Sequence, residues 1–274
     1  MTESAQALAT ALSAARAAAE VHQHYLGQVA AEAWTEKGIG DFVTHVDREA
    51  ESRIVEIIQH DQPDHEILAE EAASVNPRRY ENAEWLWIVD PLDGTTNFLH
   101  GYPMYCSSVA LLHRGEPFAG AIACAPTGEE WAAVRGGGAF RNGQRIHVSD
   151  TSRFDRALIG TGFPFKIPHV IDRYLEQFER VISRVSDIRR AGSAALDLCH
   201  LATGYLDGFW ELDLKPWDYA AGTLLIREAG GVVNGLFDLG EQTGEPDWQN
   251  GGGIIAGNPY VYSVLHDVVT GVNP

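Results

Sequence analysis

The chain has 274 residues, of which 45% are hydrophobic, so it can bury a large core as one domain or as two closely packed domains. Its formal net charge of −18 repels nucleic-acid phosphates and anionic lipid surfaces, which argues against direct nucleic-acid binding and against a membrane-surface role. The three cysteines form no CxxC motif and cannot all pair, which favours a cytoplasmic protein with free thiols in its core.

The first predicted element is an Ala-rich amphipathic helix that extends to about Trp34. This segment has no basic leader and no apolar run long enough for export or for crossing a bilayer, so we expect no membrane insertion. His22 and His24 lie two residues apart, a spacing that does not share a helix face, and we expect both at the surface.

A second helix is predicted from about His45 to His60, after a loop marked by Gly38 and Gly40. Thr44 and Asp47 have the spacing of a capping box, in which the hydroxyl and the carboxylate bind the first free N–H groups of the helix. On spacing alone, Asp47 is therefore a capping residue.

Two predicted strands end in carboxylates. Residues 64–71, DHEILAEE, read as a short strand that ends at Glu70 and Glu71, and on their own such paired acids are usually solvated. Residues 85–89, WLWIV, are too short for a helix and rich in aromatic and β-branched side chains, so they predict a buried strand. We expect this strand to end at Asp90, because proline at position 91 stops the ladder.

The turn dipeptide Asp93-Gly94 brings a second carboxylate beside Asp90. Two carboxylates in one small space need a strong compensating charge, and hard oxygen ligands suit Mg²⁺. Gly94 and Thr95 expose successive backbone N–H groups, which suit a phosphate. A lone Asp-Gly pair is more often only a surface turn, so the surrounding sequence decides between the two readings.

Residues 105–148 alternate apolar runs with turn residues and predict an antiparallel sheet, with a tight hairpin at Asn142-Gly143. The Gly136–Gly138 triplet lacks both the P-loop and the GxGxxG patterns, so it predicts a bulge or turn. Near residue 150 the pattern changes to strands that alternate with helices, which predicts two parts, 1–148 and 149–274.

Three helices are predicted in the second part. One spans residues 172–184, one opens at Gly192-Ser193, and one begins at Trp217-Asp218 and ends at Gly230-Gly231. Taken singly, Asp218 is an N-cap, and the arginines at 189 and 190 are surface charges. Beside the start of a helix, these arginines would also attract a second anionic group of a substrate.

The string DPLDGTTNF (90–98) resembles the signature of the inositol monophosphatase family, within a larger group of lithium-sensitive, Mg²⁺-dependent phosphatases. TGFPFK (161–166), RRAGSAALDL (189–198) and WDYAAGTLLIREAGG (217–231) are similar to its bacterial branch, and the resemblance covers nearly the whole chain. It implies an α/β fold, a layered αβαβα sandwich with an α+β N-terminal part, an α/β C-terminal part and the active site between them.

The resemblance also implies the roles of individual residues, with two to three Mg²⁺ per active site. Glu70, Asp90 and the carbonyl of Leu92 would hold one ion, and Asp90, Asp93 and Asp218 a second. The loop with Lys37 and Asp41 would contribute to a third, weaker position. Thr95, backed by Asp47, would polarise the attacking water, with Glu70 also counted as catalytic. The substrate would contact Asp93, Gly94, Thr95, Gly192, Ser193, Ala194, Glu211 and Asp218.

The expected activity is hydrolysis of inositol monophosphate to inositol and phosphate by metal-activated water, with inhibition by Li⁺. Trp217-Asp218 and residues 228–231 favour this substrate, whereas histidinol phosphate, fructose 1,6-bisphosphate and phosphoadenosine phosphate remain alternatives for the same chemistry. An alternative of another class is an additional role as a regulatory protein that binds the transcription machinery, as some bacterial relatives do in addition to catalysis. The resemblance also implies a homodimer and a small-molecule phosphate ester as ligand.

Overall fold

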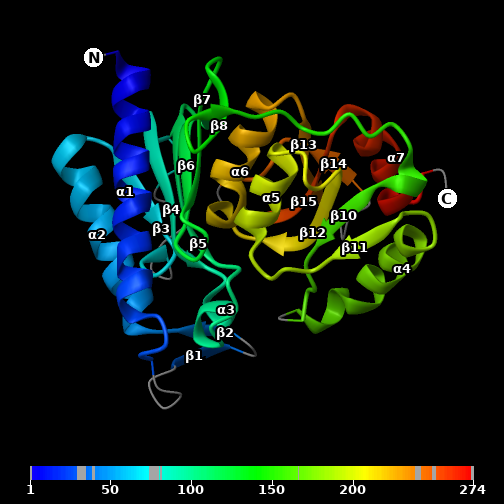
Figure 1. The fold of residues 1–274 in the computed structure, drawn as a ribbon, viewed down its shortest axis with the longest axis horizontal. Coiled ribbons are helices and arrows are strands. Elements are labelled where there is room, and N and C mark those ends of the chain that lie inside the picture. Colours follow the sequence, from blue (N-terminus) through cyan, green and yellow to red (C-terminus); the bar gives the residue numbers. More distant parts are fainter. Residues whose placement is uncertain are drawn as a thin grey trace.

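The computed structural model describes residues 2–29, 35–38, 41–73, 80, 82–165, 167–237, 242–248 and 251–272, with backbone only for 35–38 and 41–43. Helices and sheets alternate in five layers, in the order helix, sheet, helix, sheet, helix (Figure 1). The predicted αβαβα sandwich is therefore confirmed. Within the part of the chain that is described, each helix is too short or too polar to cross a lipid bilayer.

The first outer layer consists of α1 (Glu3–Tyr25) and α2 (His45–Asp61). α1 buries a stripe of alanines at helical spacing, and these small side chains let the helix lie close to the sheet. The prediction that this helix extends to Trp34 is wrong, because Leu26 leaves the helical conformation and Gly27 adopts a left-handed φ of 72°. A short hairpin of β1 (Thr35–Gly38) and β2 (Asp41–Val43) precedes α2.

The first sheet has seven strands in sequence order. They are β3 (Glu66–Ala69), β4 (Trp85–Asp93), β5 (Cys106–His113), β6 (Glu116–Cys124), β7 (Glu129–Val134), β8 (Gly138–Arg141) and β9 (Gln144–Arg145). β3 and β4 are parallel and the other pairs are antiparallel, as predicted for residues 105–148. Asn142 and Gly143 form the β8–β9 turn with φ of 49° and 75°, which matches the predicted tight hairpin.

β4 is buried on both faces. Leu86 and Ile88 face the central helices, whereas Trp87 and Val89 pack toward α1 and α2. The prediction that proline stops this strand after Asp90 is wrong. The strand continues to Asp93, because an irregularity in its pairing with β5 between Asp90 and Asp93 accommodates the proline.

The second sheet has the strand order β11-β10-β12-β15-β13-β14 and is mixed, with parallel pairing of β10 to both β11 and β12. Its strands are β10 (Leu158–Thr161), β11 (Asp187–Arg189), β12 (Gly208–Leu214), β13 (Val232–Phe237), β14 (Gln242–Gly244) and β15 (Gly252–Gly257). α4 (Ile171–Ile182) and α7 (Pro259–Thr270) cover its outer face, and α5 (Ala194–Ala202) and α6 (Pro216–Glu228) lie between the two sheets (Figure 1).

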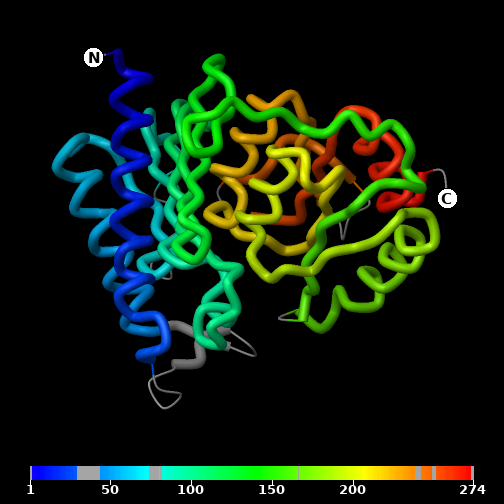
Figure 2. The backbone as a smooth tube through the Cα atoms, in the orientation of Figure 1, coloured from blue at the N-terminus to red at the C-terminus, as the bar shows by residue number. Residues whose placement is uncertain are grey.

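The chain passes from the first sheet to the second between β9 and β10, and Figure 2 shows this green segment running past the central helices. The predicted boundary at residues 148 and 149 falls in this connection; the division into two domains stays a prediction. The three cysteines are free and buried, as expected for core thiols.

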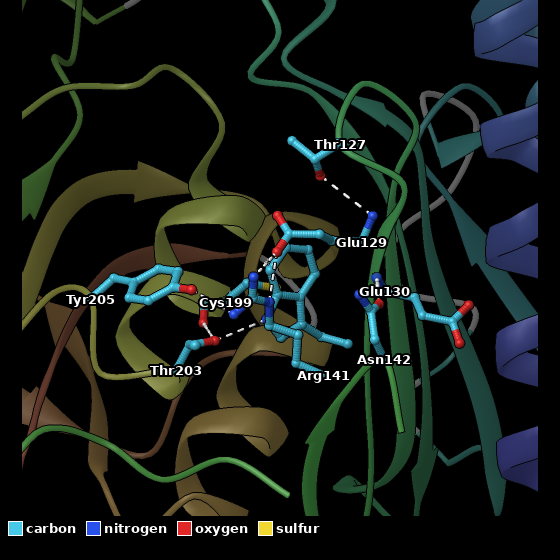
Figure 3. Close-up of polar contacts among 9 residues, drawn as sticks. Thr127, Glu129, Glu130, Arg141, Asn142, Cys199, Thr203 and Tyr205 are labelled. Atoms are coloured by element: carbon cyan, nitrogen blue, oxygen red, sulfur yellow. Dashed lines mark hydrogen bonds and ion pairs between the residues drawn. The ribbon is translucent and has the colours of Figure 1, made fainter. Parts of the chain in front are cut away.

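Polar contacts join α5 to the first sheet (Figure 3). The Trp131 indole on β7 donates a hydrogen bond of 2.9 Å to the Thr203 hydroxyl, which in turn donates one of 2.8 Å to the carbonyl of Cys199. Arg141 on β8 pairs with Glu129 and also hydrogen-bonds the Tyr205 hydroxyl, which follows α5. These contacts hold α5 and the turn that follows it against the first sheet.

Candidate active site

A cleft of about 1130 Å³ opens where β4, β10 and β12 end and where α5 and α6 begin. Both halves of the chain line it, together with the one-turn helix α3 (Thr95–Leu99). A second cavity of about 650 Å³, lined by Tyr80 and Trp248 among others, contains none of the predicted site residues. Of the predicted catalytic, metal-binding and substrate-binding residues with described side chains, all except Asp47 line the large cleft: Glu70, Asp90, Leu92, Asp93, Gly94, Thr95, Gly192, Ser193, Ala194, Glu211 and Asp218.

Three carboxylates converge at the floor of this cleft. Asp90, Asp93 and Asp218 each offer an oxygen atom within 4.8 Å of the other two. Asp90 is only 2% exposed, and its Oδ1 accepts a hydrogen bond of 2.9 Å from the Leu92 N–H. Asp218 comes from the other half of the chain, at the start of α6, where its Oδ2 accepts a bond of 2.6 Å from the N–H of Lys215.

Glu70 approaches the same carboxylates from β3. Because β3 runs parallel to β4, with Ala69 opposite Val89, the next residues, Glu70 and Asp90, lie side by side at the same end of the sheet. The Glu70 N–H donates a bond of 3.1 Å to the Val89 carbonyl, which places this residue beside Asp90.

The electrostatics of this cluster favour a bound cation. Burial raises the pKa of Asp90 well above its usual range, and the negative charges of Glu70, Asp93 and Asp218 raise it further. A divalent cation would relieve the repulsion among these groups. Hard carboxylate oxygens, together with the Leu92 carbonyl at the cleft wall, form a donor set that fits Mg²⁺.

Asp47 contacts two elements through its two carboxylate oxygens. Oδ2 accepts bonds of 2.8 Å from the Thr44 N–H and 2.6 Å from the Thr44 hydroxyl, so the predicted capping box is confirmed. Oδ1 accepts a bond of 3.1 Å from the Thr95 hydroxyl, which also lies 3.1 Å from the Leu92 carbonyl. Burial raises the pKa of Asp47.

Gly94 turns the chain between β4 and α3 with a left-handed φ of 90°. A Cβ atom at this position would lie 2.8 Å from the Met104 carbonyl oxygen, so both the conformation and the available space require glycine. The turn places the backbone of Gly94 and Thr95 in the cleft wall, beside Asp93.

Ser193 links the second half of the chain to Asp93. Its hydroxyl donates a bond of 2.6 Å to Asp93 Oδ2, and the Ala195 N–H donates one of 2.8 Å to the same oxygen. Ser193 is also the N-cap of α5. The start of α5 is therefore held directly against the carboxylate cluster.

Glu211 lies on β12 and faces the cleft against Gly162. A Cβ atom built on Gly162 would lie 1.8 Å from Glu211 Oε1, so only glycine leaves room for this carboxylate. On the rim, the Arg190 guanidinium lies 5.5 Å from the ring centroids of both Phe163 and Phe165, a cation–π arrangement.

Asp197 is a cleft residue that the sequence analysis did not select. It lies in the first turn of α5, is 2% exposed and lines the cleft. Burial raises its pKa well above the usual range, Asp93 raises it further, and Arg190 opposes the shift. One signal in the sequence could have identified Asp197: it is a single carboxylate inside the apolar run AALDLCHLA, where a buried helix face offers little hydration.

The prediction that His22 lies at the surface is wrong, whereas His24 is exposed as predicted. His22 is fully buried, and its Nε2 lies 2.8 Å from the carbonyl oxygen of Pro91, in the bulge between Asp90 and Leu92. Burial lowers the pKa of His22 to about 4, so the ring is neutral and donates through Nε2. The side chains of Lys37 and Asp41 lie outside the described residues.

Comparisons with known proteins identify a matching family and similar structures. The sequence pattern of the inositol monophosphatase family matches residues 3–270. A putative Nus factor SuhB from Neisseria meningitidis is 41% identical over 263 residues, which cover 96% of this chain and 97% of the relative.

Two solved structures are similar over nearly the whole chain. The extragenic suppressor protein suhB from Bartonella henselae has a TM-score of 0.84 at 36% identity, covering 95% of this chain and 97% of that one. An inositol monophosphatase from Anabaena has a TM-score of 0.80 at 37% identity, covering 97% and 96%.

Proposed function

Because the chain belongs to the inositol monophosphatase family, we propose that it is a Mg²⁺-dependent phosphomonoesterase that hydrolyses inositol monophosphate to inositol and phosphate. The observation that carries this proposal is the convergence of Asp90, Asp93 and Asp218 within 4.8 Å, from two halves of the chain, at the floor of a large cleft. The family match supports phosphatase activity, and the carboxylate cluster supports the metal.

Two sets of ligands fit the proposed ions. Glu70, Asp90 and the Leu92 carbonyl would hold one Mg²⁺, while Asp90, Asp93 and Asp218 would hold a second, with Asp90 shared. When bound, such ions supply Lewis-acid stabilisation of phosphate oxygens and favour ionisation of water. Family membership also motivates the proposals of a third, weaker ion and of inhibition by Li⁺.

The residues of the chain itself position the reactants. The Thr95 hydroxyl, held by Asp47, orients the attacking water. As the water loses a proton to the Thr95 oxygen, the Thr95 hydroxyl gives its own proton to the Asp47 carboxylate. The N–H groups of Gly94 and Thr95 stabilise the phosphoryl oxygens as charge develops on them. From the second half of the chain, residues 192–194 and Glu211 bind the hydroxyl groups of the leaving alcohol.

Two alternatives are kept. The same carboxylate cluster suits histidinol phosphate, fructose 1,6-bisphosphate or phosphoadenosine phosphate, since the chemistry at phosphorus is unchanged. The name Nus factor, carried by the relative from Neisseria meningitidis, favours a second role as a regulatory protein that binds the transcription machinery. In either case we propose a homodimer as the working unit.

A panel of phosphate esters separates these functions. Phosphate release from inositol 1-phosphate, histidinol phosphate, fructose 1,6-bisphosphate and phosphoadenosine phosphate is measured with and without Mg²⁺, for the wild type and Asp90→Asn. We expect Mg²⁺-dependent release to be fastest with the inositol ester and lost in the variant. Release from none of the esters, with RNA polymerase components recovered on the immobilised protein from cell extract, would favour the regulatory role instead.

A further inference from the structure

Asp197 and Glu211 belong to different elements but share one face of the second sheet. β10 pairs in parallel with β12, with Thr161 opposite Trp210, so Gly162 lies beside Glu211 just beyond β10. On β12, residues 209 and 211 point to the same side of the sheet, which is the side covered by α5.

Two glycines, Gly160 in β10 and Gly162 just after it, show where the two carboxylates lie. A Cβ atom on Gly162 would collide with Glu211 Oε1 at 1.8 Å, whereas a Cβ atom on Gly160 would lie 3.8 Å from the Cβ of Asp197. Positions 160 and 162 face the same side of an extended chain and are roughly 7 Å apart. Asp197 and Glu211 therefore lie along one wall of the cleft, about two residues of strand apart.

Asp197 differs from the other buried carboxylates near the cleft because no described group hydrogen-bonds it. Asp93 accepts bonds from Ser193 and Ala195, and Asp47 accepts bonds from Thr44 and Thr95. Within the described residues, the Asp197 side chain has no such partner, although it is 2% exposed and lines the cleft. A carboxyl group at this low exposure is poorly hydrated and is open only to the cleft, so a ligand that supplies a hydrogen bond there gains affinity.

We propose that Asp197 is a specificity-determining residue that hydrogen-bonds a hydroxyl group on the alcohol portion of a phosphate monoester, beside the hydroxyl group bound by Glu211. The inference rests on the phosphatase function proposed above. It names the substrate class more closely: the alcohol must carry at least two hydroxyl groups besides the phosphorylated oxygen, spaced to reach both carboxyl groups. Esters of simple alcohols leave Asp197 without a partner and are poorer substrates.

The test compares esters and variants in one set of measurements. Inositol 1-phosphate, its deoxy analogues that each lack one hydroxyl group, and 4-nitrophenyl phosphate are assayed with wild type, Asp197→Leu and Asp197→Asn. We expect Asp197→Leu to lower kcat/KM for inositol 1-phosphate at least about tenfold more than for 4-nitrophenyl phosphate, mainly through KM. One deoxy analogue should be used equally well by wild type and Asp197→Leu, because the hydroxyl group that Asp197 binds is already missing. Asp197→Asn keeps a hydrogen-bond acceptor, so its kcat/KM for inositol 1-phosphate should lie between those of wild type and Asp197→Leu.

Leu198→Ala is the matched control, since Leu198 is fully buried in the next position of α5 but does not line the cleft. It should lower the melting temperature and change kcat/KM for all esters by the same factor. The same uniform change in Asp197→Leu, with no analogue insensitive to the substitution, would overturn the role of Asp197 while leaving phosphatase activity established. A wild type that hydrolyses no ester would overturn the proposed function, and this inference with it.

Discussion

The Thr95 hydroxyl donates a hydrogen bond of 3.1 Å to Oδ1 of Asp47, a residue 48 positions earlier in the chain. The other oxygen of Asp47 is the acceptor of the capping box at the start of α2. One carboxylate therefore fixes the start of a helix and the orientation of the hydroxyl group proposed to position water. The capping interaction makes the second contact rigid, because it fixes the carboxylate before substrate binds.

Asp47→Asn should lower kcat about 10²-fold or more, since it removes the proton acceptor behind Thr95. It should also lower the free energy of unfolding by about 1 kcal/mol through the weakened cap. Thr44→Ala is the control, because it weakens the same cap and keeps the Asp47 carboxylate. Rate and chemical denaturation are measured for both variants. An equal loss of kcat in both would mean that Asp47 only caps the helix.

Asp93→Asn should lower kcat/KM, because it removes a charge from the proposed second metal position. The loss of transition-state stabilisation should be about several kcal/mol. The Ser193 hydroxyl and the Ala195 N–H still have an oxygen to bind, so the melting temperature without Mg²⁺ should barely change. Asp187→Asn, an exposed carboxylate paired with Arg189, serves as control. Wild-type kcat/KM in Asp93→Asn at ordinary Mg²⁺ would reduce Asp93 to a turn residue.

Glu211→Gln should shift substrate preference. The substitution keeps the shape of a side chain that lies against Gly162 but removes the charge that strengthens its hydrogen bond to a substrate hydroxyl. The loss of about 1.5 to 3 kcal/mol, roughly ten- to a hundredfold in kcat/KM, should fall mainly on inositol 1-phosphate. The ratio of kcat/KM for this ester to that for 4-nitrophenyl phosphate is the readout. An unchanged ratio argues that Glu211 does not bind substrate hydroxyls.

His22 should make the protein less stable as the pH falls below 7. Its pKa is 6.5 when exposed and about 4 in the folded protein, so between these values the unfolded chain binds the extra proton. Stability from this group is therefore complete above pH 6.5 and decreases toward pH 4, by about 2 kcal/mol at pH 5. His22→Leu should remove this component of the pH dependence, and His24→Leu, at an exposed position, should keep it. Denaturant unfolding at pH 7 and pH 5 measures the difference.

Much of the fold was predictable because local patterns and tertiary packing agree. The short apolar run around Trp87 and the Asn142-Gly143 turn specify their structures over a few residues. The extension of β4 beyond Asp90 was not predictable, because a bulge paired with β5 accommodates the proline that a simple ladder excludes. The end of α1 at Tyr25 was also missed, since the alanine-rich sequence continues to favour a helix.

The family motifs indicate most of the site residues from the sequence alone, and the structure brings these residues to one cleft. Residues to which the resemblance assigns no role are harder to identify from the sequence. His22 looked solvent-exposed because helical periodicity cannot tell which face will meet the bulge at Pro91. Asp197 was missed because an acid in the first turn of a helix has a sufficient explanation in the helix dipole, and only its packing against β10 gives it a place in the cleft.

Removing Mg²⁺ by chelation and then adding it back tests the proposed Mg²⁺-dependent phosphatase most directly. Phosphate release from inositol 1-phosphate and the melting temperature are measured on the same samples. The clustered charges around Asp90 predict that exhaustive EDTA treatment abolishes release, and that added Mg²⁺ restores it and raises the melting temperature. Asp218→Asn should weaken both responses together. Full phosphate release after exhaustive chelation, with no change in melting temperature on adding Mg²⁺, would contradict the proposed metal-dependent phosphatase.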